Sequence, residues 1–376
     1  MLFDEMDTED VLFDVEEGGL FDTDDVDVSL SEEDILNARH TPELISHESV
    51  ERKLLHMLEN GRFPHGLIFS GPAGIGKSVM AYRLARFLFS EKDREPDMFG
   101  APEPSTSLFV KNDHPIFSKV ASGGHPDLLT IERPVDEASG RVKASVPVEE
   151  IRKIAPFMRK TASEEGGWRI VIVDDADTMT RSSQNSLLKI LEEPPEKSLL
   201  VLITHRAGAL LPTVYSRCIH LPFQPLSDAN IQEALAGRVL ATDMPLIISM
   251  AEGSLGRALN FSDEAHMSMI QDCLVHFQNW PRFQWSSIQE FADVFGNKGN
   301  DEGQRILRDF FLWLASSLVR RRSSGVGILE RMEEKLGVEQ RLKIYDALNA
   351  HFDLCQHGNL DKRFFIMGAF MAFEGF

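Results

Sequence analysis

The segment from Gly71 to Ser78 reads Gly-Pro-Ala-Gly-Ile-Gly-Lys-Ser and fits the phosphate-binding pattern GxxxxGK[ST] at every position. It stands after a short apolar run and before a run with helical spacing, which is the context that the pattern needs. Glycines at Gly71, Gly74 and Gly76 let the backbone wrap around an anion, so that successive N–H groups and the helix N-terminus face the negative charge. This segment therefore predicts a site for nucleotide phosphates.

Lys77, Ser78 and Asp174 can serve a nucleotide and its metal ion. The Lys77 ammonium can reach the beta and gamma phosphates of ATP, and the Ser78 hydroxyl can help to hold Mg²⁺. Further along the chain, the run 168–177 has the pattern of a Walker B strand, because it is apolar and then ends in carboxylates. Asp174 is placed to bind the magnesium ion through water. Asp177 better fits a cap on the helix that follows.

These side chains need a scaffold, and the apolar patterns predict one. Short apolar runs predict strands at 66–70, 127–132, 168–174 and 199–204. Helical spacing predicts helices at 49–60, 77–89, 147–161 and 182–192. Such alternation indicates an α/β domain with a parallel sheet that is covered by helices on both faces. After Pro225 the strand patterns stop, and further helices are expected around 306–319, 338–352 and 361–373.

The chain divides into four predicted parts, with bounds at 1–38, 39–225, 226–264 and 265–376. The first part contains fifteen Asp or Glu and no Lys or Arg, so it cannot bury enough apolar surface to repay ordering, and we expect a disordered acidic tail. The triplet Leu-Phe-Asp occurs in it at 2–4, 12–14 and 20–22. These triplets are either short docking motifs or chance apolar residues in a solubilising tail.

Composition excludes several classes of protein. No apolar window approaches the length of a membrane span, and the N-terminus is acidic where a signal peptide would be basic, so we expect a cytoplasmic protein without membrane contact. Cys218, Cys273 and Cys355 lie far apart without CxxC spacing, which indicates free thiols. Outside the tail only five of the twenty excess negative charges remain, and even a mildly acidic body is a poor lone binder of duplex DNA.

Four motifs together resemble the bacterial clamp-loader subunits of DNA polymerase III, which belong to the AAA+ family. They are GPAGIGKS, VIVDDAD, LLKILEEPP and YSRC, in this order and spacing, within a resemblance that covers residues 39 to about 225. The resemblance implies an α/β P-loop NTPase (AAA+) domain at 39–225. It implies that 226–264 is a small helical lid and that 265–376 is an all-α C-terminal collar domain.

The resemblance also implies roles for three further residues. Arg217, in Ser-Arg-Cys, would be a finger presented to ATP in the neighbouring subunit, where a guanidinium can stabilise transition-state charge. Asp175 stands where AAA+ ATPases usually carry the glutamate that activates water, and it is shorter by one methylene, so whether this chain hydrolyses ATP stays open. The polar sensor of the gamma phosphate falls at Thr204 or His205, and Thr204 is favoured.

Two departures from the family bear on the type of subunit. Gly256 stands where the ATPase subunit has its second-sensor arginine, and whether Arg257 replaces it stays open. The four-cysteine zinc module of better-known relatives is missing, and the histidines left in that region, His114 and His125, make a poor structural zinc site, so we expect no zinc.

These features favour the delta-prime type of clamp-loader subunit over the gamma/tau type. The absent cysteines, Asp175 and the lack of a long C-terminal extension support that choice. Such a subunit would bind ATP and Mg²⁺ with weak or no ATPase activity of its own. Its partners would be gamma/tau and delta subunits and, through the complex, the sliding clamp and primer-template DNA. The alternatives are a gamma/tau-type ATPase subunit, a self-sufficient AAA+ motor, or an interaction protein with a vestigial P-loop.

Overall fold

The computed structural model describes residues 37–61, 63–91, 105–135, 142–163, 167–295, 301–321, 326–357 and 362–374. The predicted acidic tail with its Leu-Phe-Asp triplets lies outside the described residues, apart from Asn37 and Ala38.

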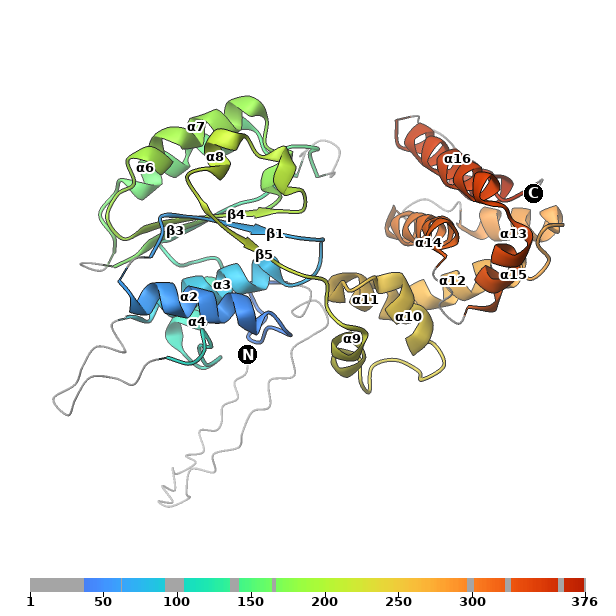
Figure 1. Cartoon of the computed structure of the whole chain (residues 1–376), viewed down its shortest axis with the longest axis horizontal. Coiled ribbons are helices and arrows are strands. Elements are labelled where there is room, and N and C mark those ends of the chain that lie inside the picture. Colours follow the sequence, from blue (N-terminus) through green and yellow to red (C-terminus); the bar gives the residue numbers. More distant parts are fainter. Residues whose placement is uncertain are drawn as a thin grey trace, which may run out of the picture.

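A parallel sheet forms the centre of the N-terminal part (Figure 1). Its strands in the described ranges are β1 (Gly66–Ser70), β2 (Leu128–Ile131), β3 (Arg169–Val173), β4 (Ser198–Thr204) and β5 (Ile219–Pro222). Their spatial order is β2-β3-β4-β1-β5, and every pairing is parallel. The four predicted strands are confirmed. β5 was not predicted because it is a four-residue edge strand in which only Leu221 is buried.

Helices cover both faces of this sheet, as expected (Figure 1). One face carries α2 (Glu48–Glu59), α3 (Lys77–Phe89) and α4 (Pro115–Ala121), and the other carries α5 (Val148–Arg152), α6 (Ile154–Met158), α7 (Arg181–Glu192) and α8 (Pro212–Tyr215). Alternate residues of β1 point to opposite faces, so Leu67 and Phe69 enter one core while Ile68 enters the other. The α/β class predicted from the sequence is therefore confirmed.

The helix expected at 147–161 is two short helices, α5 and α6, joined at Lys153. Pro156, inside α6, explains the break, because a proline has no N–H to donate to the carbonyl of Arg152 and one helical bond across the junction is therefore missing. Periodicity alone had suggested one continuous helix.

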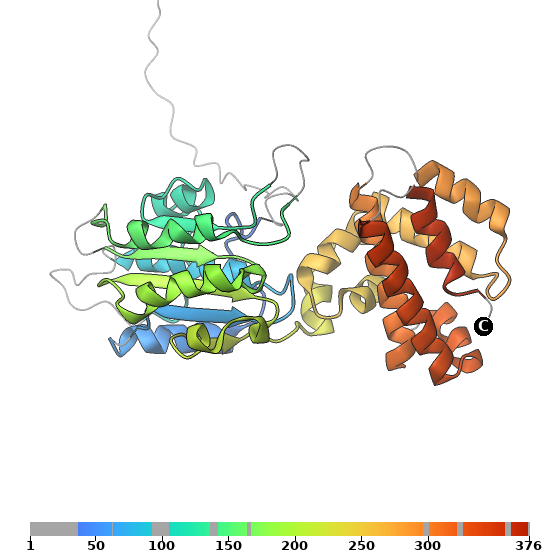
Figure 2. The same cartoon turned by 90° about the horizontal axis from the view of Figure 1, so that it is seen from above.

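Only helices follow β5 in the described ranges (Figure 2). They are α9 (Asp228–Ala234), α10 (Met244–Ala251), α11 (Leu255–Ser262), α12 (Glu264–Phe277), α13 (Trp285–Phe295), α14 (Asp301–Arg320), α15 (Gly327–Lys335), α16 (Val338–His357) and α17 (Lys362–Met371). We call α9, α10 and α11 the lid helices. The exact division at residues 225 and 264 stays a prediction. No helix among the described residues is long and apolar enough to cross a membrane.

Aromatic rings fill the core of the last six helices. Phe277 lies 5.0 Å from both Phe370 and Phe373, and Phe311 lies 5.3 Å from Phe370, measured between ring centroids. All four rings are almost completely buried. Contacts at these tilted and edge-on angles contribute beyond the burial of apolar area. They join α12, α14 and the end of the chain into one packed unit.

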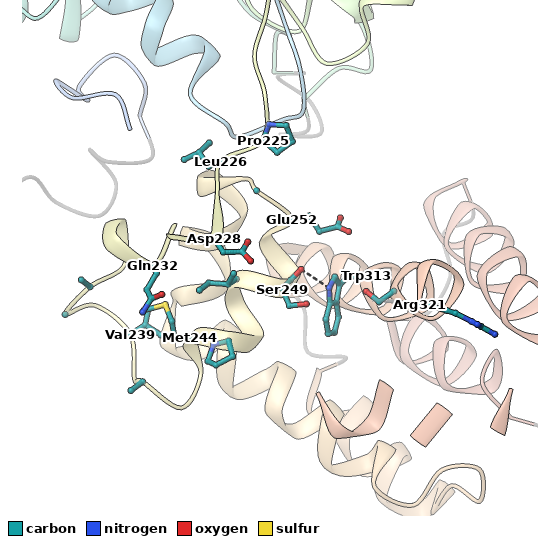
Figure 3. Close-up of a pocket in the computed structure, with 17 residues that line it drawn as sticks. Pro225, Leu226, Asp228, Gln232, Val239, Met244, Ser249, Glu252, Trp313 and Arg321 are labelled. Carbon is teal, nitrogen blue, oxygen red and sulfur yellow. Dashed lines mark hydrogen bonds between the residues drawn. The ribbon is translucent and has the colours of Figure 1, made fainter. Parts of the chain in front are cut away.

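A polar joint connects the lid helices to α14. The indole of Trp313 donates a hydrogen bond to the carbonyl of Ser249 at 3.0 Å (Figure 3). Glu252, at the end of α10, accepts bonds from Arg257 at 3.0 Å and from Arg320 on α14. The lid helices are thus fixed to the helical unit behind them.

Candidate functional site

The register of the sheet brings the predicted site residues to one edge. Ser70 pairs with Thr204, and Val173 pairs with Leu202, so the loops after β1, β3 and β4 all leave the sheet at its carboxyl end. In open α/β sheets ligands bind at this edge, where neighbouring strands connect to opposite faces.

The glycine-rich loop closes tightly against other parts of the chain. Gly74 has φ 71° and Gly76 has φ 99°, in the left-handed region that side chains rarely adopt. A Cβ on Gly74 would overlap the hydroxyl of Ser254, and one on Gly76 would lie 2.7 Å from a methyl of Leu44. Buried His47 donates from Nε2 to the carbonyl of Ile75 at 2.8 Å and holds the loop from below. The loop is therefore a preformed cradle for an anion.

Lys77 is buried at the bottom of this cradle. Its Nζ donates to the carbonyls of Gly71 at 2.8 Å and Pro72 at 2.5 Å, and it lies 3.0 Å from Nδ1 of His205. Burial lowers the pKa of Lys77 to about 8, although the carboxylate of Asp174 and its acidic neighbours oppose the shift. A buried ammonium with mainly neutral oxygen partners favours the arrival of an anion.

Ser78 and Asp174 meet beside Lys77. The Ser78 hydroxyl donates to Oδ2 of Asp174 at 2.9 Å, and the amide of Asp175 donates to Oδ1 of Asp174 at 2.9 Å. Burial raises the pKa of Asp174 above its ordinary value. A hydroxyl and a carboxylate oxygen are hard donors of the kind that Mg²⁺ prefers, so the pair fits a magnesium site.

Asp175 is already engaged by two side chains. Its Oδ2 accepts from Nε of Arg133 at 2.7 Å, and its Oδ1 lies 2.8 Å from Nε2 of His205. The hydrogen bond from His205, followed by the charge of Arg133, holds the pKa of Asp175 below its ordinary value. A general base must be free to take a proton from water, so this carboxylate is poorly prepared for that task.

His205, rather than Thr204, connects the cradle to Asp175. The Thr204 side chain is fully buried, and its hydroxyl accepts from the amide of Arg206 at 3.0 Å. The sequence hypothesis favoured Thr204, but His205 is the residue whose ring reaches Lys77. An ammonium can only donate hydrogen bonds, so Nδ1 of His205 accepts the bond from Lys77. Nε2 of His205 therefore carries the N–H and donates it in a hydrogen bond to Asp175.

A cavity of about 610 Å³ opens beside the cradle, which is a size typical of small-molecule sites. Most of its walls come from three regions: residues 41–45, the loop with Lys77 and Ser78, and the segment 226–259, in which Arg238 follows α9 and Leu259 lies on α11. Two buried arginines hold the first wall in place, since Arg83 donates to the carbonyl of Pro42 at 2.6 Å and Arg86 donates to the carbonyl of Thr41 at 2.8 Å.

The backbone of the lid helices bonds directly to the cradle. The amide of Gly256 donates to the carbonyl of Gly74 at 2.8 Å, and a Cβ on Gly256 would lie 3.1 Å from the Cα of Gly74. Arg257 does not line the cavity, because its guanidinium bonds to Glu252. The structure therefore brings neither second-sensor candidate to the cavity as a charged side chain.

A larger cavity, of about 1030 Å³, lies on the other side of the lid helices, between α9, α10 and α14 (Figure 3). Leu226 lines both cavities, but none of the predicted site residues lines the larger one. Of the predicted site residues, Gly74, Gly76, Lys77 and Ser78 line the smaller cavity, together with His205.

Arg217 stands at the opposite edge of the sheet from the cradle. It precedes β5, whose residue Ile219 pairs with Leu67 while Pro222 pairs with Ser70. These two levels are about 10 Å apart at roughly 3.3 Å per residue. The Arg217 guanidinium pairs with Glu192 at 2.6 Å and donates to the carbonyl of Thr213 at 2.9 Å, and a third of its side chain is exposed. It cannot serve the cradle of its own chain.

Two smaller expectations have clear outcomes. The predicted free thiols are confirmed, with Cys273 buried and the other two half-buried. The helix-capping interpretation of Asp177 is wrong, because Thr180 caps α7 while Asp177 accepts from the amide of His205 at 3.0 Å. Across the residues that the structure describes, no group of three His, Cys, Asp or Glu could hold a metal ion.

Sequence reasoning missed His47 and Arg133. A lone histidine before a helix and an arginine after a strand carry no motif, and their partners, Ile75 and Asp175, lie 28 and 42 residues further along the chain. The only feature of the sequence that could have indicated Arg133 is its place directly after one predicted strand, since the next predicted strand along the chain ends in carboxylates.

Comparisons with known proteins point in one direction. Residues 46–227 match the family model described as DNA polymerase III, delta subunit. The DNA polymerase III subunit delta' of Bacillus subtilis is 31% identical over 213 residues, which cover 57% of this chain and 58% of that protein. The gamma/tau subunit of Mycobacterium tuberculosis is 30% identical over 230 residues, which cover 59% of this chain and 36% of that protein. The chain thus spans about half the length of the curated relatives it matches.

Among solved structures, a DNA polymerase III gamma subunit-related protein from Thermotoga maritima aligns with a TM-score of 0.39 and 16% identity, covering 85% of this chain and 98% of that one.

Phosphate binding should change the protonation of Lys77. With a pKa of about 8 in the free chain, roughly half of the Lys77 side chains are neutral at pH 8, and nearby phosphate charge raises the pKa again. We expect ATP binding at pH 8 to take up protons, little uptake at pH 6.5, and weaker binding as pH rises above 8. Calorimetry in buffers of different ionisation enthalpy measures the uptake. Lys77→Arg, which stays charged, should bind without it, and equal uptake in this variant would contradict the assignment.

The purified protein should contain no stoichiometric zinc, since the sequence lacks the thiolates that make a closed tetrahedral site. Elemental analysis after dialysis provides the measurement. One equivalent of zinc per chain would disprove this expectation.

Proposed function

We propose that this delta-prime-like member of the bacterial clamp-loader family binds ATP with Mg²⁺ at its own P-loop and supplies Arg217 to ATP held by a neighbouring subunit. Its resemblance to clamp-loader subunits is confirmed over residues 46–227. The observation that carries the proposal is the position of Arg217, exposed at the sheet edge opposite to its own P-loop.

Nucleotide binding rests on the cradle and its side chains. Lys77 exchanges its bonds to the carbonyls of Gly71 and Pro72 for bonds to phosphate oxygens, which suits a buried ammonium better. Ser78 and Asp174 hold the magnesium ion. That ion neutralises charge on the phosphates when it is bound. The lid helices close the cavity above the glycines through the contact of Gly256 with Gly74.

Weak hydrolysis by the chain itself follows from the network around Asp175. The carboxylate is short, and both of its oxygens are occupied, by Arg133 and His205. In this proposal His205 takes the sensor role in place of Thr204, because it contacts Lys77 and Asp175 together. Among the described residues that line the cavity the one arginine is Arg238, which follows α9 on the side of the lid helices, so the P-loop side of the cavity is lined by no arginine that could stabilise transition-state charge.

A delta-prime role implies an assembly with gamma/tau- and delta-type subunits, which loads the sliding clamp onto primer-template DNA in the cytoplasm. The gamma/tau relatives cover a similar share of this chain, so a gamma/tau-type ATPase subunit is the second candidate. Gly256 at the second-sensor position and the engaged Asp175 favour the delta-prime role over that candidate, and also over a self-sufficient motor.

The isolated chain should bind ATP·Mg²⁺ and hydrolyse it slowly, because Asp175 is engaged and no neighbour supplies an arginine. Equilibrium binding of a fluorescent ATP analogue and steady-state phosphate release from a verified monomer measure the two properties. Ser78→Ala should weaken the Mg²⁺-dependent part of binding. Fast turnover by the monomer would instead favour the motor alternative.

Arg217→Ala should lower the ATPase rate of the assembled complex, at the site it serves, by a factor on the order of 10³ to 10⁵, the contribution of an arginine finger. ATP affinity of the isolated chain should stay unchanged. Arg217→Lys should restore little of this rate, because the point charge of an ammonium cannot reproduce the planar fork of donors on a guanidinium.

The control for this variant is Lys153→Ala, which removes an exposed cation paired with Glu150 in the same domain. It should leave turnover of the complex unchanged. If the Arg217→Ala complex turns over at the wild-type rate, or if the isolated variant loses ATP affinity, Arg217 does not act on a neighbour's nucleotide.

A further inference from the structure

A chain of hydrogen bonds connects the end of β1 to the segment that carries Arg217. Nε2 of His220, on β5, bonds to the hydroxyl of Ser70, the last residue of β1. Nδ1 of the same ring bonds to the hydroxyl of Tyr215, the last residue of α8, at 2.5 Å. The rings of Tyr215 and His220 also touch, with centroids 5.1 Å apart. Both ring nitrogens of His220 therefore make hydrogen bonds, Nε2 with β1 and Nδ1 with α8.

One end of this chain is fixed to the P-loop. The carbonyl of Ser70 accepts from the amide of Phe223 at 2.7 Å, and the next amide, of Gly71, donates to the carbonyl of Thr204 at 3.3 Å. A Cβ on Gly71 would lie 2.5 Å from the carbonyl oxygen of Phe223, so the loop begins in direct contact with the residue that follows β5. A movement of the loop on ligand binding would therefore act directly on Ser70 and on the end of β5.

The other end is fixed to the finger segment. α8 is a single turn of four residues, which is too short to be stable by itself. Tyr215 anchors its last residue, and Thr213, in the same turn, accepts the bond from the Arg217 guanidinium at 2.9 Å. Besides this turn, Arg217 is held by the exposed carboxylate of Glu192. The position of α8 therefore sets the position of the Arg217 side chain.

A neutral imidazole makes such a chain directional. It has one N–H donor and one acceptor nitrogen, whereas the hydroxyls of Ser70 and Tyr215 can each donate or accept. If Ser70 donates to Nε2, then Nδ1 carries the proton and Tyr215 must accept. If Ser70 accepts, Tyr215 must donate. A change in the bonding of Ser70 therefore reverses the bond at Tyr215 through a change of tautomer. In that change one ring nitrogen releases its proton to solvent and the other takes a proton from solvent, so the net charge of the ring is the same before and after.

We propose that Ser70, His220 and Tyr215 are positioning residues that couple nucleotide at the chain's own P-loop to the placement of Arg217. The inference rests on the proposed function, since it assumes that Arg217 acts on a neighbour. The subunit then offers its finger according to the state of its own site.

The first test follows His220 in the isolated chain. Histidine-selective ¹⁵N labelling reports the tautomer of each ring by NMR, and loss of one signal in His220→Gln assigns it. Saturating ATP·Mg²⁺ should shift the ¹⁵N signals of His220 in the wild type. It should not shift them in Ser70→Ala, which lacks the hydroxyl. Unmoved His220 signals at saturation would overturn the coupling, and so would an equal shift in Ser70→Ala. If ATP does not bind at all, the proposed function fails and the coupling with it.

The second test measures turnover by the assembled complex. Tyr215→Phe removes a single hydroxyl from a partly exposed ring and keeps its packing. We expect about a fivefold lower kcat, corresponding to one net hydrogen bond, with KM for ATP unchanged and ATP affinity of the isolated chain unchanged. Tyr345→Phe, at an equally exposed tyrosine of α16, is the matched control and should have no effect.

The double variant separates this inference from the finger assignment. If Tyr215 acts through Arg217, adding Tyr215→Phe to Arg217→Ala should cause no further loss, and an additive fivefold loss would refute that route. A wild-type kcat for Tyr215→Phe while Arg217→Ala is inactive would overturn the positioning role and leave the finger intact. A wild-type rate for Arg217→Ala itself would remove the proposed function first.

Discussion

The parallel pairing of β1 with β4 on one side and β5 on the other is the constraint on which the rest of the structure depends. It sets Ser70 level with Thr204 and with Pro222. The P-loop, the acidic end of β3 and His205 consequently leave the sheet at one edge, while the turn with Arg217 enters it at the other. A slip of one residue in either ladder would turn alternate side chains to the wrong face and separate these groups.

Electrostatics at the P-loop edge follow from burial. Lys77 is almost completely enclosed, which makes its charged form costly until an anion arrives. His205 accepts a hydrogen bond from this ammonium and donates one to Asp175, which also accepts a bond from Arg133. The same network that prepares the cradle for phosphate therefore restrains the carboxylate that would activate water. In the proposed function, this arrangement of a few polar groups favours nucleotide binding over hydrolysis.

The lid helices act through backbone contact where many nucleotide sites use a charged side chain. Gly256 approaches Gly74 so closely that their backbones share a hydrogen bond. Arg257 is directed away and, with Arg320, binds Glu252, which joins the lid helices to α14. The charged side chains near the lid helices thus stabilise the attachment of these helices to the C-terminal helices. The cavity itself is closed by the close packing of backbone against backbone.

The sequence by itself determined the P-loop, the strand that ends at Asp174, and the α/β order of elements, because each depends on residues that are close in the chain and on periodicity within a single element. It could not give the contact of His205 with Lys77, the engagement of Asp175, or the break near Pro156 within a helical pattern. Only the tertiary structure decided these, and it also made the bond between Ser70 and His220, which are 150 residues apart. Side-chain partners of this kind depend on which strands pair and in which register, and no local pattern encodes that.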